Sequence, residues 1–305
     1  MENQANLQRT IAKEAQCAGI SLHSGKQVQI KIKPAPENHG IKFVRTDLPN
    51  RPCVAARFNK VVDTSQATVI GDDGFIVSTI EHLMAAFAGL SIDNALVEVD
   101  DYELPFIDGS AGPFVRLLQT AGIRVQHAPR YYFVVQEPVE IEEQEKFVGV
   151  YPSPDFRITF TIEYSQCPLI GTQTYSVNIT PDTFAAEIAD ARTFGFVQEV
   201  EYMKMYGLAK GASLDNAVVI DRDKVLNQEG LRFPDEFVRH KILDCVGDFS
   251  LIGLPILGHV VAKRSGHAFN HAFLEKFFSN KGAWQTRILE DQNAWAKQLV
   301  KQVAN

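Results

Sequence analysis

The sequence predicts an α+β protein with two domains. Its 305 residues are enough to form two hydrophobic cores. Patterns typical of strand, helix, helix and strand follow one another in the first half of the chain and again in the second half. Hydrophobic residues make up 45% of the chain and charged residues 22%, as in ordinary soluble globular proteins. We therefore expect a first domain at residues 1–128 and a second domain at residues 129–305.

The first half is predicted to combine short strands with two helices. Residues 28–33 alternate between polar and apolar side chains, which predicts a half-buried strand. Further strands are expected at residues 75–77 and 94–99, and helices at residues 78–89 and 113–121.

The second half begins with residues 131–135, whose aromatic and β-branched side chains favour a strand. We expect an antiparallel sheet to continue through residues 147–150 and 157–162, with further strands at 217–220 and 258–262. Helices are predicted at residues 184–190, 199–206, 235–251 and from 269 onward, with a loop at residues 191–196.

Charge and cysteine content limit the classes of partner and the compartment. A net charge of −7 excludes a nucleic-acid surface that depends on bulk basicity. The four cysteines are scattered without a C-x-x-C motif, which predicts reduced thiols. The longest apolar run, at residues 249–262, contains Pro255 and His259 and is too short to cross a bilayer. No secretory signal is recognisable, so we expect a cytoplasmic protein without a transmembrane segment.

The most informative stretch is the helix predicted at residues 235–251. His240, Asp244 and Asp248 are spaced four apart and therefore lie along one side of that helix. A neutral imidazole and a carboxylate at this spacing are suitable zinc ligands. The alternative is a solvated polar face, because so short a pattern often arises by accident. A catalytic metal site would also need a third ligand and a base.

Glu81 and His82 offer that third ligand and base at the start of another predicted helix. The imidazole could bind a metal while the adjacent carboxylate reaches a water molecule beside it. Two structural alternatives remain open at this point. Ser78 and Glu81 match a capping box, in which Glu81 only satisfies a backbone amide, and His82 could simply be a polar residue on an apolar helix.

Taken together, these stretches resemble the UDP-3-O-acyl-N-acetylglucosamine deacetylases, which are the zinc amidases of lipid A biosynthesis in Gram-negative bacteria. The matching pieces appear in the family's order and span nearly the whole chain. They are residues 19–26 (GISLHSGK), 78–83 (STIEHL), 103–105 with 108–110 (ELP and DGS), 191–194 (ARTF), 230–233 (GLRF), 236–241 (EFVRHK) with Asp244, and 265–267 (SGH).

The resemblance implies two α+β domains, each a small, mostly antiparallel sheet layered against a pair of helices, with the active site between them. It also implies that His82, His240 and Asp244 bind one Zn²⁺ and leave a fourth position for water. Fe²⁺ would suit the same ligands.

The implied reaction is hydrolysis of the acetamide of UDP-3-O-(3-hydroxyacyl)-N-acetylglucosamine, which gives the free amine and acetate in the committed step of lipid A biosynthesis. Glu81 matches the general base, and the Thr193 hydroxyl matches the group that stabilises the oxyanion. His267 matches the acid that protonates the leaving amine, with Asp248 keeping it protonated. Lys241 would add positive charge at the site.

Further residues match substrate contacts of the family. His23 matches a loop histidine near the site, and Tyr164 and Arg264 match contacts to uracil and diphosphate. An insert resembles the hydrophobic passage for the acyl chain, although such apolar residues would ordinarily be core. Its matching residues are Phe194, Val197, Val200, Gly211 and Ser213.

Two other functions are compatible with the same residues. One is a metal hydrolase that acts on a different acylated amino sugar. The other is a sugar-nucleotide or acyl-chain binding protein without activity, although this alternative predicts the loss of site residues that are all present here. We expect the protein to be a monomer.

Overall fold

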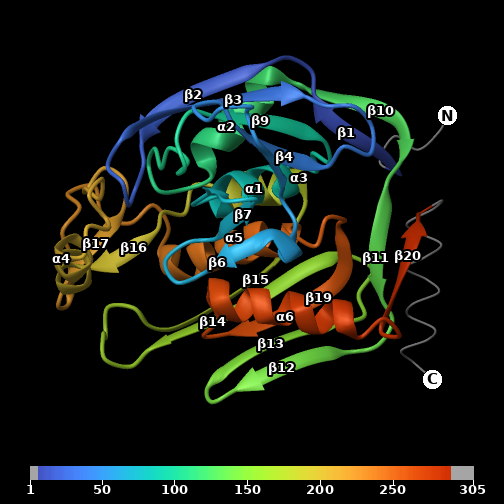
Figure 1. Cartoon of the computed structure of the whole chain (residues 1–305). Helices are drawn as coiled ribbons and strands as arrows, with labels where there is room; N and C mark the ends of the chain where they lie inside the picture. The colour runs from blue at the N-terminus through green and yellow to red at the C-terminus, as the bar shows by residue number, and fades with distance from the viewer. Residues whose placement is uncertain (1–5, 290–305) are drawn as a thin grey trace.

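The computed structural model describes residues 6–289 and has two main sheets with helices packed between them. Figure 1 shows helices α1 (Glu81–Gly89) and α5 (Glu236–Ser250) in the middle of the molecule, between an upper and a lower sheet. No helix in the described range is long and apolar enough to span a bilayer. The last part of the predicted second domain, residues 290–305, lies outside the described residues.

The upper sheet has five strands, all from the first half of the chain. In spatial order they are β2 (Ala15–Ile20), β3 (Gln27–Pro34), β9 (Ala95–Val99), β4 (Ile41–Arg45) and β5 (Cys53–Ala55). Helix α2 (Gly112–Ala121) packs beside α1 and against β2. Neighbouring strands are antiparallel except for β4 and β9.

The lower sheet has seven strands from the second half. Five of them follow the order β12 (Val139–Glu143), β13 (Lys146–Tyr151), β19 (Ile256–Lys263), β11 (Tyr131–Val135) and β20 (Trp284–Ile288). Strand β14 (Phe156–Tyr164) pairs with β19 and with β15 (Gly171–Asn178). Strand β19 is parallel to β11 and β14, and the other pairs are antiparallel. Helix α6 (His267–Ser279) packs on β12, β13 and α5.

Smaller elements complete the described chain. The remaining strands are β1 (Leu7–Ile11), β6 (Val61–Asp63), β7 (Val69–Asp72), β8 (Phe75–Val77), β10 (Ile123–Pro129), β16 (Phe194–Phe196), β17 (Val218–Asp221) and β18 (Lys224–Val225). The remaining helical segments are η2 (Phe58–Lys60), α3 (Pro181–Thr183), the π-helical turn η3 (Phe184–Ile188) and α4 (Val197–Met205).

Helices α1 and α5 pack against each other unusually closely near the start of α1. A Cβ atom added to Gly247 would lie 2.1 Å from the carbonyl oxygen of Glu81, so only glycine permits this approach. Apolar side chains on both helices, such as Leu83 and Val246, are almost fully buried. Each such side chain contributes about 1.5–3 kcal/mol through its removal from water. Packing therefore holds the two halves of the chain together along this helix pair.

The structure confirms the predicted α+β fold class, with most strand pairs antiparallel. The expected domain boundary falls inside β10, and a division there remains a prediction. The expected loop at residues 191–196 is wrong in part, because β16 forms there by pairing with β17 in parallel.

The structure excludes the capping box that the sequence left open as an alternative for Ser78 and Glu81. Helix α1 begins at Glu81, and no side chain caps it. Thr79 adopts a left-handed conformation with φ of 59°, which separates Ser78 from the helix. The Glu81 carboxylate instead accepts a hydrogen bond from the backbone amide of Thr68 at 3.1 Å. Glu81 is therefore available at the interface between the two sheets.

Substitution of Gly247 by alanine should separate α1 from α5. The added methyl group would meet the backbone of Glu81, which cannot move aside like a flexible side chain. We expect a loss of about 1–3 kcal/mol in the free energy of unfolding, typical of overpacking, together with weaker metal binding. Thermal unfolding and metal titration measure the two effects. Gly266→Ala is the matched control, because a Cβ atom there would meet nothing within 4 Å. Equal behaviour of the two variants would contradict this account of the helix contact.

Candidate metal centre and active site

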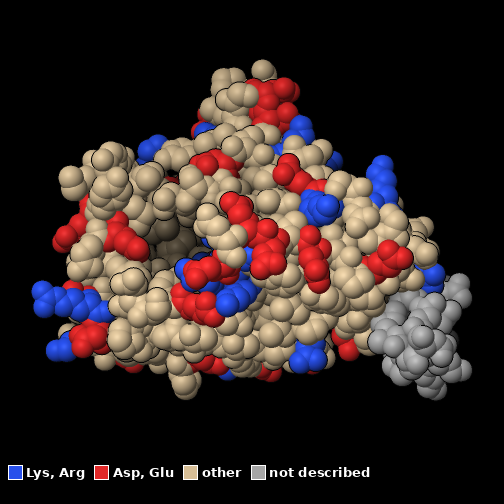
Figure 2. All heavy atoms as spheres, turned by 90° about the horizontal axis from the view of Figure 1, so that it is seen from below, with Lys and Arg blue, Asp and Glu red and all other residues tan. Residues whose placement is uncertain are grey.

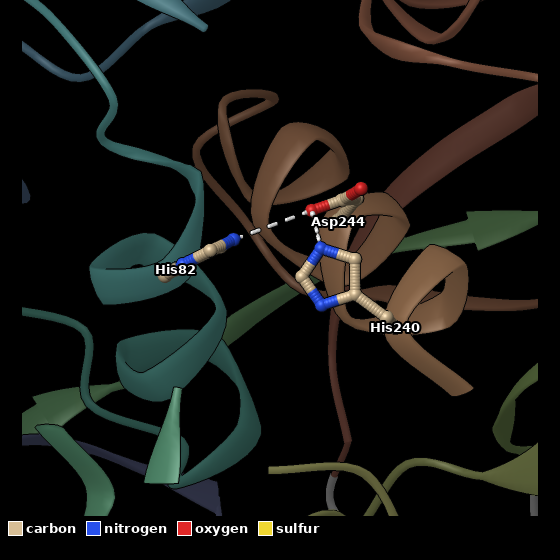
Figure 3. A group of neighbouring side chains, drawn as sticks. All are labelled: His82, His240 and Asp244. Atoms are coloured by element: carbon tan, nitrogen blue, oxygen red, sulfur yellow. Dashed lines mark ion pairs between the residues drawn. The ribbon is translucent and has the colours of Figure 1, made fainter. Parts of the chain in front are cut away.

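His82, His240 and Asp244 bring three potential metal ligands together from two helices. Figure 3 shows the His82 side chain of α1 pointing toward the His240 and Asp244 side chains of α5. One ligand atom from each residue lies within 4.8 Å of the others, and all three residues are buried. The Asp244 Oδ1 atom lies 3.4 Å from His240 Nε2 and 3.6 Å from His82 Nε2.

These three atoms face one another at ion-pair distances, which is an unusual arrangement for buried polar atoms unless something joins them. In addition, His82 Nδ1 is buried without a hydrogen-bond partner among the described residues. Two imidazole nitrogens and a carboxylate oxygen form a donor set that suits Zn²⁺ or Fe²⁺. The residues present therefore fit a bound divalent cation.

The protonation state of His240 is suitable for a metal ligand. Its Nδ1 atom lies 3.0 Å from the carbonyl oxygen of Ala191, which can only accept a hydrogen bond. Nδ1 must therefore carry the proton, and Nε2 presents a lone pair toward Asp244. Burial lowers the pKa of His240 to about 3, although Asp244 acts in the opposite direction. The imidazole is thus neutral at physiological pH.

Asp244 carries the negative charge of the group. Burial alone would raise its pKa, but His240 and Lys241 hold the pKa well below its usual range. Lys241 Nζ donates a hydrogen bond of 2.8 Å to Asp244 Oδ2, which leaves Oδ1 directed at the two imidazoles. Lys241 therefore both orients and partly neutralises this carboxylate.

Glu81 is a buried carboxylate next to this group. Burial raises its pKa, and this effect exceeds the opposing influence of His267 and His82. One carboxylate oxygen accepts the bond from Thr68, and the other lies 4.0 Å from His267 Nε2. A carboxylate with a raised pKa is suited to accept a proton near neutral pH.

His267 and Asp248 form an ion pair next to Glu81. His267 Nδ1 lies 2.9 Å from Asp248 Oδ2, which also accepts a bond of 2.8 Å from Asn270 Nδ2. The Thr68 hydroxyl donates a bond of 2.5 Å to the other Asp248 oxygen. Burial alone would lower the pKa of His267, but Asp248 and the neighbouring carboxylates raise it to about 10. His267 is therefore a cation that can supply a proton through Nε2.

A buried ion pair connects the Ala191 loop to α5. Arg192 and Glu236 are both almost completely buried, with Nε and Oε1 at 2.8 Å. The same Oε1 atom accepts a bond of 2.9 Å from the Arg192 backbone amide. Since Ala191 and Thr193 flank Arg192, this pair fixes both the carbonyl bound to His240 and the position of Thr193.

His23 lies in a loop that Glu103 holds in place. The Glu103 carboxylate is fully buried and accepts bonds from the backbone amides of His23 and Ser24 at 2.7 and 2.8 Å. Both ring nitrogens of His23 are buried and have no partner among the described residues. Burial lowers the pKa of His23, although Glu103 opposes the shift. The imidazole is therefore positioned to meet a polar group of a ligand.

A cavity of about 500 Å³ connects these groups. Figure 2 shows a hollow on the side of the molecule where α4 and β16 lie in Figure 1. The following candidate residues line the cavity: His23, Glu81, His82, Thr193, Phe194, Val197, Val200, Ser213, His240, Lys241, Asp244 and His267. The structure therefore brings most of the predicted site residues to a single cavity.

The apolar part of this cavity lies along α4. Val197 and Val200 line it together with Met203 and Leu214. Helix α4 has no buried residue, so Val197 and Val200 do not belong to the protein core. A surface helix with an apolar side toward a cavity can accommodate an apolar ligand group.

Four predicted residues lie outside the cavity lining. Asp248 does not line the cavity itself, but it is hydrogen-bonded to His267, which does. Gly211 packs against the backbone of Ser21, where a Cβ atom would lie 2.2 Å from the carbonyl oxygen. Tyr164 has its ring 5.8 Å from that of Phe194.

The fourth, Arg264, pairs with Glu145 and lies 3.9 Å from Glu163, with 38% of its side chain exposed. Contacts of Gly211, Tyr164 and Arg264 with a substrate remain predictions.

Several functional contacts were not predicted from the sequence. Thr68 and Asn270 lie in no recognisable motif, so nothing indicated their bonds to Asp248. Glu103, Arg192 and Glu236 belong to stretches that carry the family resemblance, but a charged residue alone does not reveal its partner. The sequence did offer one signal for these three residues, which is a charged side chain among apolar neighbours. Such a side chain is rarely buried without a partner, so the pattern indicates a buried ion pair or hydrogen bond.

The chain is similar over most of its length to several proteins that share one name. A relative from Myxococcus xanthus (strain DK1622) is 48% identical over 278 residues, which cover 91% of this chain and 88% of the relative. One from Syntrophotalea carbinolica is 51% identical over 278 residues, covering 91% and 90%. One from Anaeromyxobacter sp. (strain Fw109-5) is 47% identical over 294 residues, covering 96% of each chain. All three are named UDP-3-O-acyl-N-acetylglucosamine deacetylase.

The family model described as LpxC, UDP-3-O-acyl N-acetylglycosamine deacetylase, matches residues 8–279. This confirms the resemblance found in the sequence. The chain belongs to the UDP-3-O-acyl N-acetylglycosamine deacetylase family.

Proposed function

We propose that this protein is a zinc-dependent deacetylase that hydrolyses the acetamide of UDP-3-O-(3-hydroxyacyl)-N-acetylglucosamine. The convergence of His82, His240 and Asp244 beside the buried carboxylate of Glu81 is the observation that carries the proposal. The names of the relatives supply the substrate class. We further propose that the reaction serves lipid A biosynthesis in the cytoplasm and that the protein acts as a monomer.

A Zn²⁺ ion held by His82, His240 and Asp244 would activate water and polarise the acetamide carbonyl, and Fe²⁺ could replace it. Glu81 is placed to accept the proton of the attacking water, because its raised pKa favours proton uptake. Lys241 keeps Asp244 oriented toward the two histidines.

After water adds to the amide carbon, negative charge develops on the former carbonyl oxygen. Thr193 lines the same cavity, and we propose that its hydroxyl donates a hydrogen bond to that oxygen. The leaving nitrogen must gain a proton before the C–N bond breaks. His267 is proposed to donate this proton, since Asp248 keeps the imidazole in its cationic form.

The cavity also suggests how the rest of the substrate binds. The side bounded by α4 offers Phe194, Val197 and Val200 to the O-acyl chain. Ser213 and the unpartnered nitrogens of His23 are available to polar groups of the sugar. We propose that the nucleotide extends toward Tyr164 and Arg264, where an aromatic ring and a cation suit uracil and diphosphate.

Replacement of His82 by alanine should remove one metal ligand and abolish deacetylation. We expect the bound metal per chain to fall severely and kcat/KM to drop by about a thousandfold or more, because the remaining two ligands hold a cation poorly. Metal analysis of protein purified without chelator and release of acetate from UDP-3-O-acyl-N-acetylglucosamine are the measurements.

His39→Ala is the matched control, because the His39 ring bonds to the carbonyl of its neighbour Gly40 and does not line the cavity. An H82A protein with full metal content and full activity would disprove the proposal. Full metal content without activity on this substrate in the wild-type protein would instead favour a different acylated amino sugar.

Replacement of Asp248 by asparagine should move the alkaline limb of the pH profile to lower pH. The pKa of His267 is raised to about 10, above the ~6.5 of an unfolded histidine. The pair of protonated His267 with Asp248 therefore contributes its full stabilisation of the folded protein below about pH 6.5. This contribution is lost as pH rises through about 10. Loss of the carboxylate should lower the pKa by about 1–3 units. The pH dependence of kcat/KM measures the shift.

Asp72→Asn, which alters a half-buried pair with Lys60 outside the catalytic cavity, is the control and should leave the profile unchanged. An alkaline limb at the same pH in D248N and the wild type would show that His267 is not the acid, or that Asp248 does not set its pKa.

A further inference from the structure

A second cavity lies between the two halves of the molecule, at the other end of the α1–α5 pair. Its volume is about 300 Å³. Met84 and Phe87 of α1 and Val246 and Phe249 of α5 form part of its wall. Within the described chain it shares no lining residue with the catalytic cavity. It is therefore a separate space, and the proposed reaction does not use it.

The wall of this cavity is largely apolar. Met84, Phe87 and Phe249 are nearly fully buried, and Ile41 and Leu254 add partly buried aliphatic surface. An apolar cavity of about 150 Å³ can hold benzene, so this space accommodates a larger apolar group. At ~30 Å³ for each water-sized group, it has room for roughly ten carbon atoms. Its volume and mostly apolar lining suit a short hydrocarbon body.

A cation lies at the mouth of the same cavity. Arg57 lines it, and Arg57 Nη1 donates a bond of 3.3 Å to the carbonyl oxygen of Ile252. The guanidinium rests directly on Gly253, because a Cβ atom there would lie 1.3 Å from Nη1. No carboxylate pairs with Arg57 in the part of the chain that the structure describes. In contrast, the lining residue Arg130 is paired with Asp93 at 2.8 Å. Among the lining residues that the structure describes, Arg57 therefore carries the one uncompensated positive charge.

We propose that this cavity binds a small amphiphile with a single carboxylate, of the chemical class of a medium-chain fatty acid. The hydrocarbon body lies between α1 and α5, and the carboxylate meets the guanidinium of Arg57. A planar guanidinium binds a carboxylate through two parallel hydrogen bonds, and Arg57 is exposed at the cavity mouth, where a carboxylate can reach it. A single negative charge also matches Arg57, the one unpaired cation among the described lining residues.

Such a ligand would contact the same helices that carry the candidate metal ligands. Met84 follows His82 by two residues, and Val246 follows Asp244 by two residues. The ligand would also touch both halves of the chain, since Ile41 and Leu254 line opposite sides of the interface. Binding should therefore stabilise the folded protein, because the unfolded chain has no such cavity.

The test is calorimetric titration of the full-length, metal-loaded protein with decanoate, with decanol as the uncharged comparison. We expect saturable binding of decanoate, weaker binding of decanol, and a higher unfolding temperature with decanoate. Arg57→Gln should weaken decanoate binding about tenfold or more, and Arg57→Lys less, because lysine keeps the charge. Arg51→Gln is the matched control, since Arg51 is exposed and lies outside the cavity.

A photoreactive decanoate analogue locates the site independently. Cross-links should map to residues 84–92 and 249–256 in the wild-type protein and decrease in R57Q. Three results would overturn the proposal: no decanoate binding by the wild type, equal affinity in the wild type and R57Q, or cross-links confined to the catalytic cavity at residues 193–219. None of these readouts depends on deacetylase activity.

Discussion

The approach of Gly247 to the backbone of Glu81 is the contact on which the candidate site depends. Metal ligands must lie within narrow distances of one ion, and here they come from two helices far apart in the sequence. His82 follows Glu81 directly, while Asp244 precedes Gly247 by three residues. The contact that fixes the helix separation is thus within one turn of His82 and Asp244 and about two turns from His240. A larger residue at this position would move the whole ligand set, whatever the identity of the ligands themselves.

The charge of each buried histidine at the site depends on whether a carboxylate is its hydrogen-bond partner. His240 and His267 are both buried imidazoles, yet the pKa of one is lowered to about 3 and that of the other is raised to about 10. His240 donates to a carbonyl, whereas His267 faces Asp248 at 2.9 Å. His267 also begins α6, where the positive end of the helix dipole disfavours a cation. Asp248 therefore has to outweigh both burial and the dipole to keep His267 charged.

Periodicity predicted the α+β class and most helices, because local patterning reports which face of an element is buried. Residues 235–251 illustrate this, since the helix extends from Glu236 to Ser250. The meeting of His82 with that helix could not follow from spacing, because it depends on packing between distant segments. Family resemblance supplied it instead. The local pattern at Ser78 and Glu81 also allowed a capping box. The structure excludes it, because Thr79 is left-handed and the Glu81 carboxylate turns toward Thr68.

The α1–α5 pair divides the interface into two chemically different ends. Near the start of α1, carboxylates and imidazoles face a cavity of about 500 Å³. Beyond Met84 and Val246, the same helices present apolar side chains to a cavity of about 300 Å³. Buried charges stabilise a helix contact only where they are paired. The hydrophobic side chains along the two helices must therefore supply most of the energy that holds the helices together. An apolar ligand at the second end would extend that packing. One helix pair can therefore border two cavities of different chemistry, a polar one at one end and an apolar one at the other.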